Sequence, residues 1–191
     1  MISFNKKLIF VHIPKCGGTS MEKFILENID NEAVETKHFD IDRYSSTYHS
    51  INSYFKFSMI RDPYDRFRSL YHYFCKGSEL YKNKSVDSDI SISDFALNLA
   101  EGSPFTSGRA WPAHYRTQYS FIKDSCDFIL KIENINEDIE VIKKKFNCPQ
   151  SYFPQINISK KSSLSDLPGK TVEIINDIYD IDFRMFGYIK K

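Results

Sequence analysis

The chain has 191 residues, of which 41% are hydrophobic and 27% are charged, so it can bury a core and is not a disordered tail. Its 26 Lys and Arg residues nearly balance its 25 Asp and Glu residues, which gives a formal net charge of +1. This balance argues against a protein held to nucleic acid by bulk charge, but it allows a local basic pocket.

The cysteines and the hydropathy of the sequence argue against disulfide-rich, metal-binding, secreted and membrane-spanning proteins. The four cysteines form neither a Cys-x-x-Cys pair nor a cluster with histidine at metal-ligand spacing, so we expect reduced thiols and no metal site. No apolar stretch approaches the ~20 residues that a membrane helix needs, and residues 8–13 are too short for the apolar region of a signal peptide. We therefore expect a cytoplasmic protein that does not span a membrane.

A strand, a turn and a helix are predicted near the start of the chain. Residues 8–13 form a continuous apolar run that is typical of a buried parallel strand. Pro14 ends this run, a Gly-Gly turn follows, and the pattern predicts a helix over residues 20–28. Thr19 and Glu22 have the spacing of a capping box, which predicts that the helix starts at the turn.

A second unit of the same kind follows. Residues 55–60 predict a strand, and a helix is expected to run from Pro63 to about Cys75. Asp62 is a good N-cap, proline fits the first helical position, and Asp65 has the spacing of a second capping box.

The remaining pattern predicts helices over residues 92–99, 136–146 (capped by Asn136) and 171–179, a strand over 127–132, and irregular segments over 102–114 and 147–169. Strands that alternate with helices predict an α/β fold: a P-loop-like parallel sheet flanked by helices on both faces, in a single domain over residues 1–191. Ligands of such sheets bind beyond the C-terminal strand ends, so the turns at 14–19 and 61–63 should line one site.

The turn at residues 14–20 has the composition of an anion cradle. Glycines let the backbone approach a ligand, a helix N-terminus supplies positive potential, Lys15 adds a full charge, and Thr19 and Ser20 add hydroxyl groups. The lysine precedes the glycines, whereas in a Walker loop it follows the last glycine. The turn therefore predicts a phosphate-binding site that differs from that of ordinary nucleoside triphosphatases; a tight turn with a solvent-exposed lysine is the alternative.

Two segments resemble a known family. Residues 11–20 resemble the 5′-phosphosulfate loop of the carbohydrate sulfotransferases, which use 3′-phosphoadenosine 5′-phosphosulfate (PAPS), and residues 57–71 resemble their 3′-phosphate segment. The similarity is to the heparan 2-O and chondroitin/dermatan type and their bacterial relatives, and it continues through residues 131–134, 153–160 and 186–188. It implies a PAPS-dependent sulfotransferase.

The chain departs from this family at Cys16, where threonine is more usual. The change removes a hydroxyl contact but keeps a backbone amide, and a thiol beside a lysine at a helix N-terminus should be oxidisable. In this short chain we expect no membrane anchor or stem like that of the Golgi relatives, and we therefore expect a soluble bacterial enzyme.

The resemblance implies roles for individual residues. Lys15, with the amides of the turn, would bind the donor and stabilise charge on the leaving phosphate oxygen, so it is also a catalytic candidate. Arg61 and Ser69 would bind the 3′-phosphate, although a local ion pair between Arg61 and Asp62 is the alternative. The full set of predicted PAPS-binding residues is Lys15, Cys16, Gly17, Gly18, Thr19, Ser20, Arg61, Ser69, Ser159 and Lys160.

The general base should titrate near neutrality, and the chain has five histidines. His38 ranks first because it lies between the two phosphate segments, where related enzymes carry a Lys-His segment with the catalytic base. His49 and His114 are the alternatives. His12 is expected in the core, and His72 is expected to pack on the second helix.

The sequence indicates less about the acceptor substrate than about the sulfuryl donor. Aromatic and cationic residues over 76–116, with Trp111 among them, suit a carbohydrate or glycolipid acceptor, while a small alcohol or a protein tyrosine stays open. Two other functions also stay open: a P-loop nucleotide kinase or NTPase, and a non-catalytic nucleotide-binding module. The oligomeric state does not follow from the sequence.

Overall fold

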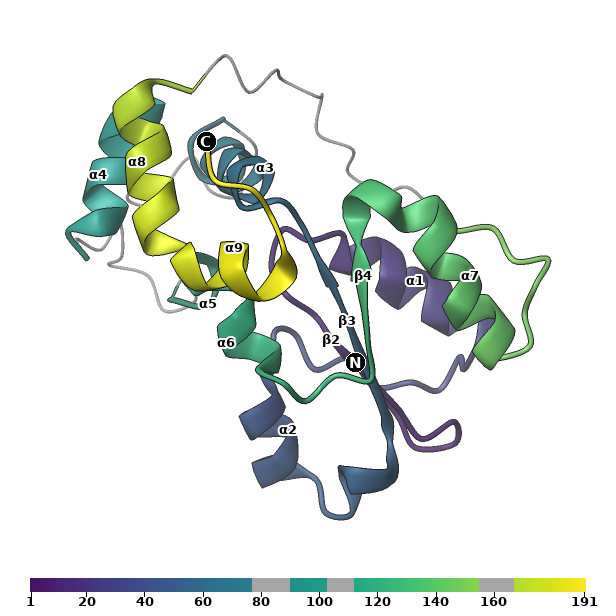
Figure 1. Cartoon of the computed structure of the whole chain (residues 1–191). Helices are drawn as coiled ribbons and strands as arrows, with labels where there is room; N and C mark the ends of the chain where they lie inside the picture. Colours follow the sequence, from purple (N-terminus) through teal and green to yellow (C-terminus); the bar gives the residue numbers. More distant parts are fainter. Residues whose placement is uncertain (77–89, 103–111, 155–166) are drawn as a thin grey trace. The chain divides into compact units, whose positions relative to one another are not determined.

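The structure is a computed structural model that describes residues 1–76, 90–102, 112–154 and 167–191 (Figure 1). The predicted site residues Ser159 and Lys160, and Trp111 of the predicted acceptor region, lie outside the described residues. The chain forms two compact units: a sheet unit of residues 1–61 and 120–158, and a helical unit of residues 62–119 and 159–191. The single domain over residues 1–191 stays a prediction.

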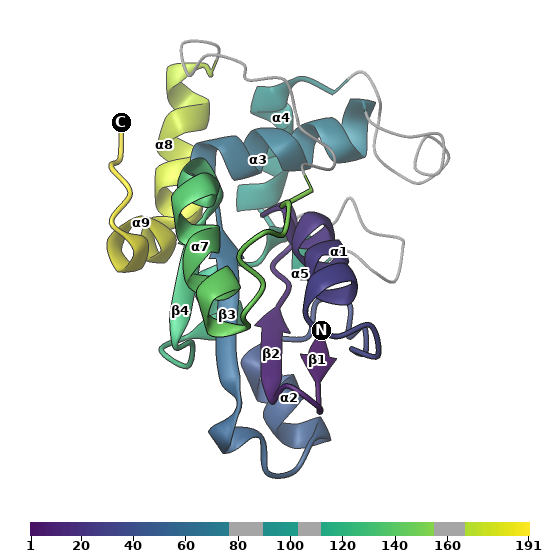
Figure 2. The ribbon, with the colours of Figure 1, turned by 90° about the vertical axis from the view of Figure 1, so that its right-hand side faces the viewer.

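The sheet unit is built on four strands in the order β1-β2-β3-β4. β1 pairs with β2 in antiparallel fashion, whereas β2, β3 and β4 are parallel to one another (Figures 1 and 2). The predicted strand over residues 55–60 is confirmed, and the other two are shorter than predicted, mainly at their C-terminal ends. The strands are Ile2–Ser3 (β1), Leu8–Val11 (β2), Phe55–Ile60 (β3) and Phe128–Lys131 (β4).

Helices cover both faces of this sheet, as predicted. α1 (Gly18–Asn28) and α7 (Ile135–Lys145) lie on one face, and their apolar side chains form a common core with Phe10, Phe57 and Leu130 of the three parallel strands (Figures 1 and 2). α2 (Ile41–Thr47) lies on the opposite face, where the Tyr44 hydroxyl donates to the Phe10 carbonyl oxygen over 3.1 Å.

Short elements complete the sheet unit. They are the 3-10 helices η1 (Ile51–Ser53) and η3 (Ile132–Asn134), and α6 (Tyr119–Ile122), which carries the chain from the helical unit back to the sheet unit. α6 buries Phe121 and Ile122. None of these short elements is among the predicted ones.

The described part of the helical unit contains α3 (Pro63–Tyr71), its π-helical continuation η2 (His72–Lys76), α4 (Ile92–Ala100), α5 (Pro112–Tyr115), α8 (Gly169–Ile178) and α9 (Asp180–Phe186). Its core is aromatic and includes Phe67, Phe95 and Tyr179. The predicted start of α3 is confirmed: the Asp62 carboxylate accepts from the backbone N–H groups of the second and third helical residues, and Pro63 is the first helical residue.

Three predicted helix starts are wrong, and one of these is the start of α8, which is Gly169, two residues earlier than predicted. α1 begins at Gly18, two residues earlier than predicted, because Gly17 adopts a left-handed conformation (φ 81°) and its carbonyl accepts from the Ser20 amide. Thr19 consequently lies inside the helix, so the predicted capping box does not form. α7 begins at Ile135, which places Asn136 in the first turn and not at the cap.

Candidate functional site

The turn between β2 and α1 carries the predicted anion cradle. Lys15 and Gly17 both have positive φ angles, 69° and 81°, which bend the chain sharply from the end of the strand into the helix. The first amides of a helix have no intrahelical acceptor and carry the positive end of its dipole. The turn therefore places a lysine next to a helix N-terminus that favours an anion.

The two glycines of the turn are required by the packing of the protein itself. A β-carbon on Gly17 would lie 3.0 Å from Cδ1 of Ile132 and 3.1 Å from Cε of Met59. A β-carbon on Gly18 would lie 2.0 Å from Cδ2 of His12. Both neighbours of Gly17 lie near the ends of adjacent strands, so the turn is held against the C-terminal edge of the sheet.

Lys15 and Arg61 are brought together at this edge. Burial lowers the pKa of the Lys15 amine from its ordinary 10.5 to about 8, the nearby positive charge of Arg61 contributes to the lowering, and the Cys16 thiol opposes it. Arg61 directly follows β3, which is the parallel neighbour of β2. Two half-buried cations near one another favour a bound anion because it offsets their mutual repulsion.

The other residues of the turn differ in their exposure. Thr19 is exposed, whereas Ser20 and Cys16 are buried. The Cys16 Sγ atom donates to the Pro14 carbonyl oxygen over 3.6 Å. A thiol without solvent exposure is shielded from oxidants, so the expectation that Cys16 is readily oxidised does not fit its position.

His38 lies in the segment between α1 and α2, with a positive φ angle of 64°. Its Nδ1 atom is 3.1 Å from the carbonyl oxygen of His12. A carbonyl oxygen can only accept, so Nδ1 carries the proton of the neutral ring and Nε2 keeps its lone pair. Burial and the neighbouring His12 lower the pKa of His38, which favours this neutral form at pH 7.

His12 and Glu22 form a second contact beside this base. The His12 Nδ1 atom is 2.9 Å from Oε1 of Glu22, and the rings of His12 and His38 meet edge to face with centroids 4.6 Å apart. Burial acts to raise the pKa of Glu22, but the hydrogen bond and charge of His12 outweigh it and keep that pKa below its usual value. His12 is thus a partly exposed bridging residue and not the core histidine that the sequence predicts.

The remaining histidines are less suited to act as the base. His49 is exposed just beyond α2. His114, in the helical unit, is buried and its ring stacks on Tyr73 at 5.7 Å with an interplanar angle of 8°. His72 is exposed at the end of α3.

Predicted residues of the 3′-phosphate segment lie in both units. Arg61 belongs to the sheet unit, and Ser69 is a partly buried residue of α3 in the helical unit. Arg66 and Arg68 of α3, which are not among the predicted site residues, are buried: Arg66 donates from Nη2 to the His114 carbonyl oxygen over 3.1 Å, and Arg68 lies 3.5 Å from an Asp65 carboxylate oxygen.

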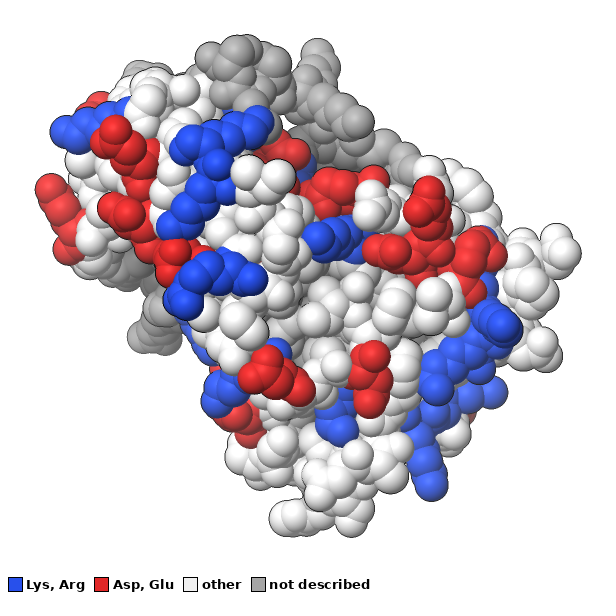
Figure 3. All heavy atoms as spheres, in the orientation of Figure 1, with Lys and Arg blue, Asp and Glu red and all other residues white. Residues whose placement is uncertain are grey.

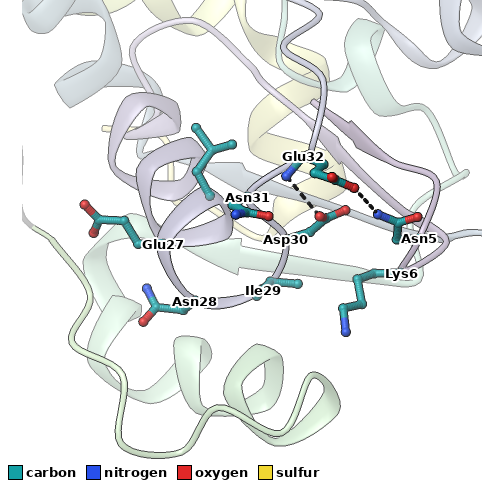
Figure 4. Close-up of a pocket in the computed structure, with 9 residues that line it drawn as sticks. Asn5, Lys6, Glu27, Asn28, Ile29, Asp30, Asn31 and Glu32 are labelled. Atoms are coloured by element: carbon teal, nitrogen blue, oxygen red, sulfur yellow. Dashed lines mark hydrogen bonds between the residues drawn. The ribbon is translucent and has the colours of Figure 1, made fainter.

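A cavity of about 480 Å³ lies at the other end of α1, next to the β1–β2 turn (Figure 4). Asp30 and Glu32 are among its lining residues, and the Asn5 amide donates to the Glu32 carboxylate over 3.0 Å. The lining carboxylates of Glu27, Asp30 and Glu32 outnumber its one cation, Lys6, and carboxylates repel anions, so this cavity does not suit a phosphate group.

Charged side chains of both signs are mixed on the drawn surface. On the face drawn in Figure 3, basic and acidic side chains are interspersed, in keeping with the near-neutral net charge.

Within the described ranges, no group of three or more His, Cys, Asp or Glu side chains could hold a metal ion. Among the helices of those ranges, none is long and apolar enough to cross a membrane.

Comparison with known proteins identifies a family that the chain matches. A family model described as the sulfotransferase family matches residues 1–189, which is nearly the whole chain. No curated protein matches the chain significantly. The match includes both segments that carry the sequence resemblance, residues 11–20 and 57–71.

Proposed function

Because the chain belongs to the sulfotransferase family, and is on that ground a sulfuryl-transferring enzyme, we propose that its donor is PAPS and its acceptor a hydroxyl group of a carbohydrate or glycolipid. PAPS carries negative charge at both ends of its ribose, on the 5′-phosphosulfate and on the 3′-phosphate. A site for it needs two cationic regions close together. The proposal rests on that requirement.

The observation that carries the proposal is the proximity of Lys15 to Arg61. The two residues follow adjacent parallel strands, and Arg61 is close enough to lower the pKa of the Lys15 amine. In the proposal, Lys15 and the first amides of α1 bind the 5′-phosphosulfate, and Arg61 binds the 3′-phosphate. An arginine presents a fork of donors that matches phosphate oxygens, which suits the group that is bound but not transferred.

Other residues that the sequence predicts to contact PAPS remain part of the proposal. The amides of Cys16, Gly17, Gly18 and Thr19 lie in the turn itself, whereas the predicted Ser20 amide already donates to the Gly17 carbonyl oxygen over 3.0 Å. Ser69, Ser159 and Lys160 are retained from the family resemblance alone, and the contribution of each is a matter for mutagenesis.

The residues of the sheet unit suggest how sulfuryl transfer proceeds. His38 takes the proton of the acceptor hydroxyl at Nε2, so that an O–H bond breaks as an N–H bond forms. The acceptor oxygen bonds to sulfur in line with the sulfur–oxygen bond to the 5′-phosphate, which breaks. The negative charge that then develops on the phosphate oxygen is stabilised by Lys15 and the helix amides.

Transfer of ³⁵S from labelled PAPS to an acceptor panel tests this function. The panel contains capsular and glycosaminoglycan-type polysaccharides, glycolipids, small alcohols and a tyrosine peptide. We expect label on a carbohydrate or glycolipid member. Binding of 3′,5′-bisphosphoadenosine without transfer to any member would favour a non-catalytic nucleotide-binding module, and magnesium-dependent ATP binding without PAPS binding would favour a kinase or NTPase.

A further inference from the structure

Three side chains from separate parts of the sheet unit form a connected row. Glu22 lies on α1, His12 follows β2, and His38 lies before α2. The Glu22 carboxylate accepts from Nδ1 of His12 over 2.9 Å, and the His12 ring meets the His38 ring with centroids 4.6 Å apart. The row therefore ends at the imidazole that the proposed function uses as a base.

We infer that Glu22 and His12 are positioning residues, which hold the His38 imidazole with Nε2 directed to the acceptor hydroxyl; the inference rests on the proposed function of His38. His12 contacts His38 twice, through its carbonyl oxygen at 3.1 Å from Nδ1 and through its ring. Glu22 fixes the rotation of the His12 ring, because a carboxylate that accepts from Nδ1 allows one orientation of that imidazole.

The same histidine also contacts the phosphate turn. The His12 ring occupies the space next to Gly18, the first residue of α1. The ring is therefore bordered by His38 on one side and by the start of the helix on another, which limits how far it can move. A strained backbone at His38, with φ at 64°, also persists only where its surroundings hold it.

Replacement of Glu22 separates positioning from substrate binding. In Glu22→Ala the His12 ring loses its acceptor, and we expect kcat for ³⁵S transfer to fall about 10- to 100-fold, since small displacements of a catalytic group have effects of this size. The Kd for 3′,5′-bisphosphoadenosine should change by less than about threefold. Glu22→Gln keeps an oxygen that accepts from Nδ1 and should restore most of the rate.

The ¹⁵N NMR signals of the His38 ring supply a readout that does not depend on turnover. The wild-type protein should show a protonated Nδ1 and an unprotonated Nε2, and Glu22→Ala should show a mixture of tautomers. Glu27→Ala is the matched control, because Glu27 is an exposed residue of the same helix that pairs with Lys23 at 3.7 Å. This control should leave both the signals and the rate unchanged.

The outcomes distinguish this inference from the proposed function. Unchanged His38 signals in Glu22→Ala would overturn the positioning role whatever the rate does. Full turnover in His38→Ala would instead overturn the proposed base, while the NMR comparison would still report on positioning. If Glu22→Ala does not fold, His12→Phe serves in its place, because it keeps an aromatic ring and loses the bond to Glu22; wild-type His38 signals in that variant would contradict the inference.

Discussion

A β-carbon on Gly18 would lie 2.0 Å from Cδ2 and 2.1 Å from Nε2 of His12. The glycine that begins α1 thus borders the imidazole that follows β2. This contact joins the phosphate turn to the histidine that touches the proposed base. It gives the second glycine of the turn a structural reason that is separate from any ligand.

Replacement of Gly18 by alanine should displace the His12 ring and break its bond to Glu22. We expect Gly18→Ala to lower the free energy of unfolding by about 1–3 kcal/mol, as overpacking typically does, and to weaken 3′,5′-bisphosphoadenosine binding. Chemical denaturation and calorimetry measure the two effects. Gly169→Ala is the control, because a β-carbon there has no neighbour within 4 Å; an equal effect in both variants would contradict the packing role of Gly18.

The lowered pKa of Lys15 predicts proton uptake when the nucleotide binds. With a pKa of about 8, Lys15 is about half protonated at pH 8 in the free protein, and a bound phosphate would draw the group to its charged form. Calorimetry at pH 8 in buffers of different ionisation enthalpy should show uptake of about half a proton with 3′,5′-bisphosphoadenosine. The uptake should disappear in Lys15→Met; an undiminished uptake there would assign it to another group.

Arg61 should distinguish nucleotides by their 3′-phosphate. We expect Arg61→Ala to weaken 3′,5′-bisphosphoadenosine about 10- to 100-fold, the effect of losing charge-assisted hydrogen bonds, and 5′-AMP by less than about threefold. Calorimetry with both nucleotides measures the difference. Arg43→Ala is the matched control, because Arg43 is an exposed arginine of the sheet unit that lies over the Phe39 ring. An equal loss for both nucleotides in Arg61→Ala would remove Arg61 from the 3′-phosphate.

The pH dependence of kcat/KM should be bell-shaped. A base must be unprotonated, so the rate should rise with pH through the pKa of His38, which burial lowers below the ordinary 6.5. Lys15 must be protonated, so the rate should fall as pH increases through about 8. His38→Ala should lose about 10²- to 10⁴-fold in kcat together with the acidic limb, with nucleotide binding intact.

His49→Ala is the control for the base, since His49 is exposed just beyond α2. It should keep both the rate and the acidic limb. A loss of the limb in His49→Ala, with retention in His38→Ala, would transfer the role to His49.

Local signals in the sequence were sufficient for much of the fold. β3 has the predicted bounds because its apolar residues are continuous, and α3 begins as predicted because Asp62 and Pro63 form a cap that depends on nearby residues alone. α2 is missing from the prediction because only two of its seven residues, Ile41 and Tyr44, are buried, which leaves little apolar periodicity. α9 is also missing from the prediction, because it follows α8 after a single residue, Tyr179.

The candidate site depends more strongly on contacts between distant residues. The closeness of Lys15 and Arg61 followed from the parallel sheet, since both residues come after the C-terminal ends of neighbouring strands. The sequence predicts a helix cap for Glu22 because its spacing from Thr19 is a local signal, whereas its bond to His12 depends on how the turn folds. Burial of Arg66 likewise depends on the distant His114 carbonyl.

A crystal structure with 3′,5′-bisphosphoadenosine tests the central claim most directly. The account predicts the 5′-phosphate on Lys15 and the first amides of α1, with the 3′-phosphate on Arg61. A nucleotide bound elsewhere, with Lys15 and Arg61 both remote from its phosphate groups, would contradict the proposed donor site.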